Sequence, residues 1–147
     1  MENVFSVFPE CIKSKLGNIG SNSGITEIRL RVNRRVIIYI SKKEITLDHV
    51  VTMKDILDIL VKVSKNSLYA IQNDINEGFV TIRGGHRIGI TGEAVLDNDK
   101  VVNIKNINSL NIRIARQILG SANTIVNYAV DDFNVKNILI VAPPRMW

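Results

Sequence analysis

From Phe79 to Gln117, apolar and polar side chains tend to alternate, and this alternation constrains the fold more than any other feature. A period of two is typical of strands that bury one face and expose the other. Turn-forming residues interrupt the alternation at Gly84-Gly85 and at 97–99, where the sequence reads Asp-Asn-Asp. Such residues accept the tight backbone of hairpin turns. The segment therefore predicts three or four antiparallel strands.

An earlier segment shows the same period and predicts a separate hairpin. Ile28 and Leu30 alternate with charged residues along a first strand, and Val36 to Ile40 form a second, more apolar strand. The Asn-Arg-Arg at 33–35 lies between them and suits a turn.

Helical spacing of apolar residues appears in four places. The predicted helices cover residues 9–16, 53–64, 67–78 and 122–131. Thr52 followed three residues later by Asp55 has the spacing of a capping box, which fixes where the second helix begins. Gly17 and Gly78 are suited to the left-handed position that closes a helix. The two central helices are expected to form a helical hairpin.

The end of the chain predicts a strand of another kind. Residues 137–142 are almost entirely apolar and are followed by two prolines. Such strands are covered on both faces, as in parallel α/β sheets. We therefore predict an α+β domain over residues 1–135, in which the hairpin and the helical hairpin pack on an antiparallel sheet. Residues 136–147 are predicted to be the first strand of a second domain.

Composition excludes several classes of protein. The 147 residues are 46% hydrophobic and carry a net charge of +5, which permits a polyanionic partner without requiring one. Cys11 is the only cysteine, so no internal disulfide forms, and we expect it to be buried or half-buried. Together with His49 and His86 it offers too few soft ligands to predict a zinc site. No signal peptide, membrane span, nucleophile elbow or phosphate loop appears, and the cytoplasm is the expected compartment.

Basic residues of the first hairpin suggest one class of partner. Arg29, Arg31, Arg34 and Arg35 form the densest basic cluster in the chain. Such a cluster suits the phosphates of nucleic acid, or an anionic membrane surface. We identified no aromatic residue interleaved on that face for base stacking, which counts against nucleic acid.

A second basic group surrounds the Gly-Gly turn and the end of the alternating segment. His86 and Arg87 follow the turn and are suited to grip a phosphate or a neighbouring subunit. Arg113 points away from the apolar face, and Arg116 lies three residues farther on. The alternative is that all four are simply solvated residues on the outer face of the sheet.

Three stretches resemble a known family when they are taken in order. They are the runs at 67–95, which contains GGHRIGITG, at 104–122, which contains SLNIRIAR, and NILIVAPP at 137–144. Together they resemble the N-terminal part of the stage III sporulation protein AA family, which is similar to the ATPases of type II and type IV secretion systems.

The resemblance implies an N-terminal α+β domain followed by a P-loop ATPase domain that uses ATP and Mg²⁺. It implies a homo-hexamer that energises a secretion-like channel between mother cell and forespore. The partners would be other stage III sporulation channel proteins at the membrane, on the cytoplasmic, mother-cell side, and nucleic acid is not expected. A small basic nucleic-acid-binding module is the alternative reading.

In that family the phosphate loop would begin at Pro143 and Pro144, which makes them candidate nucleotide-binding residues. Arg145, Met146 and Trp147 stand where Gly-Lys-Thr would follow. The chain therefore reads as the front part of such an ATPase, cut at the start of the loop. By itself it is expected to be inactive and to bind no cofactor.

The resemblance also implies roles for the second basic group. In ring ATPases of this kind, arginines of the N-terminal domain reach the nucleotide and stabilise charge on the transferred phosphoryl group. The matching candidates are Arg87, Arg113 and Arg116. His86 and the Gly-Gly turn would shape the loop that presents them, with the glycines in a structural role.

Overall fold

A computed structural model describes residues 4–19, 24–40, 43–64, 72–116, 119–131, 134–139 and 141. The chain divides into two compact units between Ala115 and Arg116. The first unit contains a six-stranded sheet and several helices, and the second contains helix α4 and a two-stranded sheet. The predicted α+β class is confirmed.

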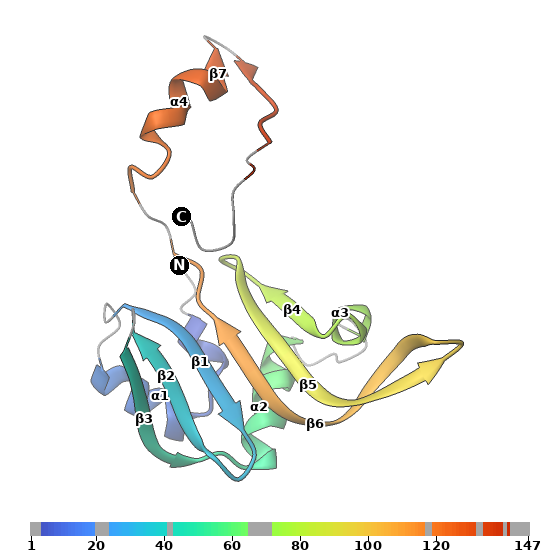
Figure 1. The fold of residues 1–147 in the computed structure, drawn as a ribbon. Helices are drawn as coiled ribbons and strands as arrows, with labels where there is room; N and C mark the ends of the chain where they lie inside the picture. The colour runs from blue at the N-terminus through green and yellow to red at the C-terminus, as the bar shows by residue number, and fades with distance from the viewer. Residues whose placement is uncertain are drawn as a thin grey trace. The chain divides into compact units, whose positions relative to one another are not determined.

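The large sheet is antiparallel throughout and has the strand order β3-β2-β1-β6-β5-β4 (Figure 1). Its strands are β1 (Ile25–Arg31), β2 (Arg35–Ile40), β3 (Lys43–Val50), β4 (Phe79–Ile82), β5 (His86–Asp97) and β6 (Lys100–Arg113). The predicted hairpin and the predicted later strands are confirmed. They form one sheet because β1 pairs with β6, where Ile28 lies opposite Ile112 and Leu30 opposite Leu110.

Sequence patterns did not predict β3. Only Leu47 of its eight residues is buried, so the apolar alternation that marks the other strands is nearly absent. The strand forms because its backbone pairs with β2, where Ile45 lies opposite Ile38. An edge strand of this kind depends on its partner more than on its own residues.

The helices of the first unit are η1 (Val4–Val7), α1 (Glu10–Ile19), α2 (Met53–Val63) and α3 (Gln72–Asn76). The first predicted helix is confirmed as α1, but Gly17 does not end it. Glycine inside a helix costs only about 1 kcal/mol relative to alanine. Buried Ile12 and Leu16 hold this segment against the core, so the helix continues for two more residues to Ile19.

The predicted capping box of α2 is confirmed. The Thr52 hydroxyl accepts a hydrogen bond from the Asp55 backbone N–H at 3.2 Å, and the Thr52 N–H donates to Asp55 Oδ2 at 2.8 Å. Burial of Asp55 opposes its ionisation, but hydrogen bonds from Thr52 and His49 outweigh it and lower the pKa of the carboxyl. The start of α2 is therefore fixed by its own residues.

The predicted helix over 67–78 is described only in part, because residues 65–71 lie outside the described residues. Its described turn is α3, which contacts β4 and β6 and buries Ile75. Gly78 has a φ of 82°, and its N–H donates to the Ile75 carbonyl at 2.9 Å. Gly78 therefore closes this helix as predicted.

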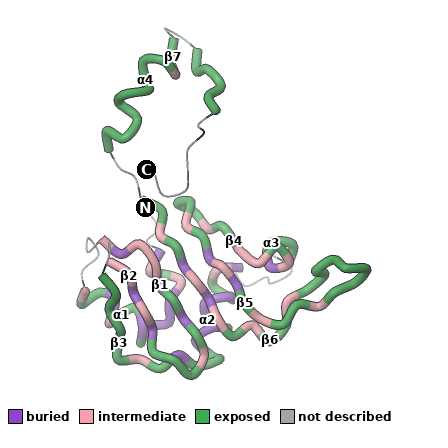
Figure 2. Tube along the Cα trace, viewed as in Figure 1, coloured by how far each residue is buried: buried purple, intermediate pink, exposed green. Residues whose placement is uncertain are grey.

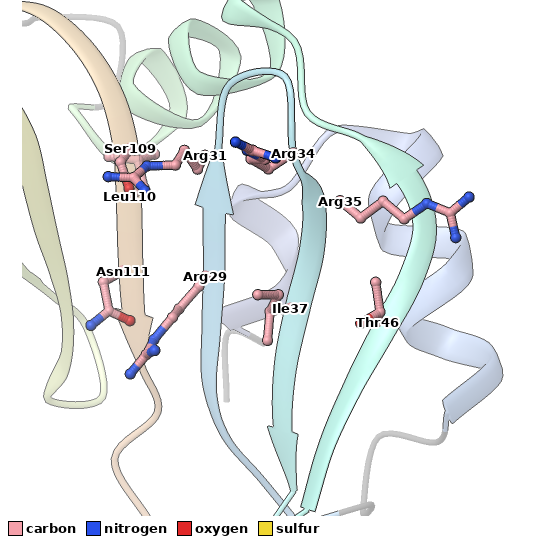
Figure 3. A pocket seen from close by; sticks show the side chains of 9 residues that line it. All are labelled: Arg29, Arg31, Arg34, Arg35, Ile37, Thr46, Ser109, Leu110 and Asn111. Carbon is pink, nitrogen blue, oxygen red and sulfur yellow. The ribbon is translucent and has the colours of Figure 1, made fainter.

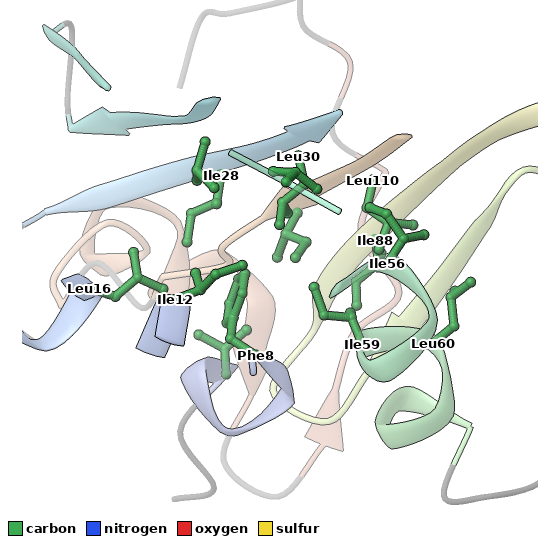
Figure 4. Close-up of a cluster of buried hydrophobic side chains, with 14 of the residues drawn as sticks. Phe8, Ile12, Leu16, Ile28, Leu30, Ile56, Ile59, Leu60, Ile88 and Leu110 are labelled. Atoms are coloured by element: carbon green, nitrogen blue, oxygen red, sulfur yellow. The ribbon is translucent and has the colours of Figure 1, made fainter. Parts of the chain in front are cut away.

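The hydrophobic core lies between one face of the sheet and the helices (Figure 2, Figure 4). In Figure 4, Phe8, Ile12 and Ile59 approach from the helical side, and Ile28 and Leu110 from the strands. All five side chains are fully buried. Because the helices cover this face, polar side chains of the same strands stand on the opposite face, which we call the outer face.

Both turns predicted in the segment from Phe79 to Gln117 are confirmed. Gly84 and Gly85 have φ angles of 95° and 77°, and Asn98 and Asp99 have φ angles of 48° and 61°. Consecutive left-handed residues match the right-handed twist of the strands that they connect.

The second unit contains α4 (Asn123–Ala129), which confirms the helix predicted near the end of the chain. Strands β7 (Val130–Asp131) and β8 (Asn134–Val135), which the sequence patterns did not predict, pair antiparallel. The predicted domain boundary between residues 135 and 136 stays a prediction.

The strand predicted over 137–142 is wrong for the residues of it that the structure describes. Asn137, Ile138, Leu139 and Val141 lie in no strand, and Leu139 and Val141 are 88% and 87% exposed. A strand needs a neighbouring backbone to pair with, and apolar composition alone does not supply one. In the described part of the chain, no segment pairs with these residues.

Candidate functional site

Arginines gather on the outer face, where the register of three strands places them. Arg113 of β6 lies opposite Arg87 of β5 on one side and opposite Glu27 of β1 on the other. Arg113 and Arg87 flank the buried Ile112 and Ile88, and their own side chains are exposed. The alternation that buries the isoleucines therefore directs both arginines to solvent. The structure brings these two predicted residues together.

The two arginines share a small pocket of about 200 Å³ with Phe79, Gly89 and Asn111. The Arg87 guanidinium carbon lies 4.7 Å from the centre of the Phe79 ring, which is the geometry of a cation–π contact. Gly89 lies between Phe79 and Asn111 in the register and has no side chain to fill the space. A glycine at this place keeps the pocket open.

Charge in this pocket is unbalanced. Among the residues that the structure describes, neither Arg87 nor Arg113 forms a salt bridge. Glu27, which lies opposite Arg113, forms its salt bridge with Arg29 instead. Like charges directly opposite on paired strands repel each other. An anion bound between the two guanidinium groups would relieve that repulsion.

Asn111 also lines a larger pocket on the same face. The larger pocket measures about 510 Å³ (Figure 3). It is lined by Arg29, Arg31, Arg34, Arg35, Ile37, Thr46, Ser109, Leu110 and Asn111. The Asn111 Oδ1 atom is buried and accepts no hydrogen bond from the described residues. The basic cluster predicted on the first hairpin therefore surrounds a real depression.

Two of the four arginines in the larger pocket have acidic partners. Arg29 donates to Glu27, and this hydrogen bond raises the pKa of the Arg29 guanidinium. Arg29 also stacks 4.7 Å from the centre of the Tyr39 ring. Arg35 forms a salt bridge with Asp48 at 3.4 Å. The positive charge free to meet a ligand here is smaller than the number of arginines suggests.

Tyr39 extends the same network toward the sheet edge. Its hydroxyl donates to Glu44 Oε2 at 2.7 Å, which raises the pKa of Tyr39. The hydroxyl also accepts from Arg29 Nη1 at 3.2 Å. An aromatic residue does stand on this face, against expectation, but the arginine covers its ring.

His86 has a positioning contact. Its Nδ1 accepts a hydrogen bond from the Ala115 N–H at 3.0 Å, which ties the start of β5 to the residue that follows β6 by two positions. A Cβ on Gly84 would lie 2.8 Å from His86 Nε2. The imidazole therefore packs against a glycine that no larger residue could replace without a shift.

Among the described residues of the first unit, Arg87 and Arg113 are the predicted arginines that line this pocket. Arg116 belongs to the second unit, and Pro143 and Pro144 lie outside the described residues. Cys11 is exposed, so the expectation that it is buried or half-buried is wrong. In α1 the buried face is formed by Ile12 and Leu16, and Cys11, one residue before Ile12, lies beside that face and not within it.

Sequence patterns missed Phe79 and Asn111. Asn111 shares its side of the strand with Arg113, two residues away, so alternation could have placed both on one face. Phe79 precedes Arg87 by eight residues in the sequence, and it is the pairing of β4 with β5 that brings its ring beneath the Arg87 guanidinium.

A family model described as sporulation stage III, protein AA, matches residues 2–147 of this chain. The chain belongs to this family. Stage III sporulation protein AA of Bacillus subtilis (strain 168) is 36% identical over 147 residues. That alignment covers 99% of this chain and 48% of the relative, so the chain spans about half the relative's length. The family that the three stretches of sequence resembled is thereby confirmed.

One solved structure is distantly similar to this stage III AA family chain. It is the VirB11 ATPase of the Brucella suis type IV secretion system in complex with sulphate, with a TM-score of 0.39 and 14% identity. The match covers 89% of this chain and 38% of that one. A likeness this weak carries no conclusion about residue roles.

Within the described residues, no helix has the length and apolar character needed to cross a bilayer.

Proposed function

We propose that this chain is the N-terminal assembly and regulatory part of a sporulation ATPase that energises a secretion-like channel between mother cell and forespore. Membership in the stage III AA family supports the proposal. The observation that carries it at the level of residues is the pocket between Arg87 and Arg113, which lack acidic partners in the described part of the chain.

In this proposal, the pocket meets the phosphates of ATP bound with Mg²⁺ by a following P-loop domain that starts near Pro143 and Pro144. A guanidinium is permanently charged and presents forked donors to phosphate oxygens. Arg87 and Arg113 would stabilise charge that develops on the transferred phosphoryl group. His86 would hold the start of β5 in position through Ala115.

The same proposal gives Arg116 a contact with the nucleotide phosphates. It also includes a homo-hexamer on the mother-cell side, with other stage III sporulation channel proteins as partners at the membrane.

The test uses a protein of the full length of the Bacillus subtilis relative. Arg87→Ala and Arg113→Ala should each lower the rate of ATP turnover by at least about 100-fold, as expected for loss of a charge-stabilising donor. Lys105→Ala, an exposed cation on the far part of β6, is the matched control and should leave turnover unchanged. If Arg113→Ala left both turnover and ring assembly intact, the proposal would fail.

Nucleic-acid binding is the second candidate, and the arginine-lined pocket of 510 Å³ is the observation that favours it. Binding of single-stranded RNA by this chain would weaken steeply with salt. Fluorescence anisotropy over a salt series, with Arg31→Ala and Arg34→Ala as variants, measures that slope. Absence of salt-sensitive binding would remove this candidate, and so would variants that both bind RNA as tightly as the unmodified chain does.

A further inference from the structure

Three potential metal ligands from three different elements meet beside the N-terminus of α2. Cys11 comes from α1, His49 from β3 and Asp55 from the first turn of α2. Cys11 Sγ lies 3.8 Å from Asp55 Oδ1, and His49 Nε2 lies 3.0 Å from Asp55 Oδ2. The ligand atoms of all three residues lie within 4.8 Å of one another.

These separations are close to those found around a single metal ion. Zinc binds sulfur at about 2.3 Å and nitrogen or oxygen at about 2.0–2.2 Å, so neighbouring ligand atoms stand roughly 3–4 Å apart. The remaining adjustment is on the order of 1 Å, which small rotations of side chains supply.

Asp55 can contribute one oxygen without giving up its structural role. Its Oδ2 atom accepts from the Thr52 N–H at 2.8 Å and from the Thr52 hydroxyl at 2.9 Å. Its Oδ1 atom, among the described residues, accepts only from the Cys11 thiol. A cation at Oδ1 therefore replaces a weak S–H contact and leaves the helix cap intact.

Access from solvent is also present. Cys11 is exposed, the His49 side chain is 17% exposed, and the Asp55 side chain is 9% exposed. The cluster thus has a buried carboxylate at its base and an open sulfur at its mouth. An ion can enter from the side of Cys11, and a water molecule can complete its coordination there.

We propose that Cys11, His49 and Asp55 bind one zinc ion. On binding, the Cys11 thiol releases its proton to solvent and its sulfur bonds to the metal as thiolate. His49 takes the tautomer that carries its proton on Nδ1, gives up its contact with Asp55, and offers the Nε2 lone pair to the metal. Two negative ligands balance the double positive charge of zinc, and the soft sulfur disfavours Mg²⁺ and Ca²⁺. The site joins α1 to β3 and α2, and it does not depend on the proposed ATPase function.

Cobalt is the probe, because Co²⁺ occupies zinc sites and a thiolate ligand gives it a charge-transfer absorption in the near ultraviolet. We expect the 147-residue chain to bind one Co²⁺, to show this band, and to lose it when Zn²⁺ is added. Zinc should also raise the Tm of the protein, because a ligand that binds only the folded state stabilises it.

Variants separate this site from adventitious binding. Cys11→Ser, at an exposed position, should fold normally and abolish the charge-transfer band. His49→Gln should weaken Co²⁺ binding by at least about tenfold. That is the smallest loss of metal affinity usual for residues that only hydrogen-bond to a metal ligand, and a ligand itself should matter at least as much. His86→Gln removes the other histidine and should change neither result. Absence of the band in the unmodified chain, or its persistence in Cys11→Ser, would overturn the proposal.

Discussion

Arg87 and Arg113 lie directly opposite each other on β5 and β6, and within the described residues neither is neutralised by an acid. The arrangement is unfavourable for the isolated sheet, because paired strands bring like charges close. It is favourable for a site that receives an anion, because the pocket between them is already formed. The arginine pair therefore lowers the stability of the folded sheet while favouring the binding of an anion.

Replacing one member of the pair should reveal this opposition. We expect Arg113→Gln to raise the free energy of unfolding by about 0.2–1 kcal/mol at low salt, since it removes the repulsion. Added salt should shrink the difference through screening. Pyrophosphate should stabilise the unmodified chain more than the variant. Urea unfolding at two salt concentrations measures these effects, and a destabilised Arg113→Gln would contradict the expectation.

Two glycines should respond in opposite ways to the same substitution. A Cβ on Gly92 would lie 2.5 Å from the Lys105 carbonyl oxygen and 2.8 Å from Ile104 Cγ2, so Gly92→Ala should cost about 1–3 kcal/mol. Gly17 lies inside α1 with nothing within 4 Å of the added atom. Gly17→Ala should therefore stabilise the protein by about 0.5–1 kcal/mol. Thermal unfolding of both variants gives the comparison, and a shift of the same sign in both would show that local crowding does not decide the outcome.

The capping box of α2 should make a measurable contribution to stability. Thr52→Ala removes the oxygen that accepts from the Asp55 N–H and should cost about 1 kcal/mol. Thr52→Ser keeps that oxygen and serves as the control. The expected result is a lower urea midpoint for Thr52→Ala with an unchanged slope. Equal midpoints for the two variants would mean that tertiary packing alone holds the helix end.

Tyr39 provides a test that depends on pH. The neutral hydroxyl donates to Glu44, so the hydrogen bond stabilises the protonated form and raises the pKa of Tyr39. Deprotonation breaks this bond, and its stabilising effect is present below the ordinary tyrosine pKa of about 10 and is lost as the pH rises through the raised value.

We expect Glu44→Gln to move the pKa of Tyr39 back toward its ordinary value. Ultraviolet titration of tyrosinate measures it, with Tyr39→Phe subtracted to isolate this residue. If Glu44→Gln left the titration curve of Tyr39 unchanged, the hydrogen bond to Glu44 would not be the cause of the raised pKa.

Local sequence determined the elements whose signals are short-range. The alternation after Phe79, the turn glycines at 84 and 85, and the Thr52–Asp55 cap each depend on contacts within a few residues, and the structure confirms them. Helix ends and edge strands were less predictable. Gly17 failed to end α1, and β3 formed with one buried residue, because packing against distant segments outweighed local preference.

Only the tertiary structure decided which residues meet. The pairing of β1 with β6 joins segments about eighty positions apart in the chain. It merges β1–β3 and β4–β6 into one sheet. That pairing places Asn111 of β6 beside the arginines of the first hairpin, which line the larger pocket. The packing of α1 near α2 brings Cys11 to Asp55. Alternation tells which side of a strand a residue occupies, but it does not name the neighbouring strand. The neighbour is chosen by the burial of apolar surface shared among all the segments, a quantity that no short stretch of sequence contains.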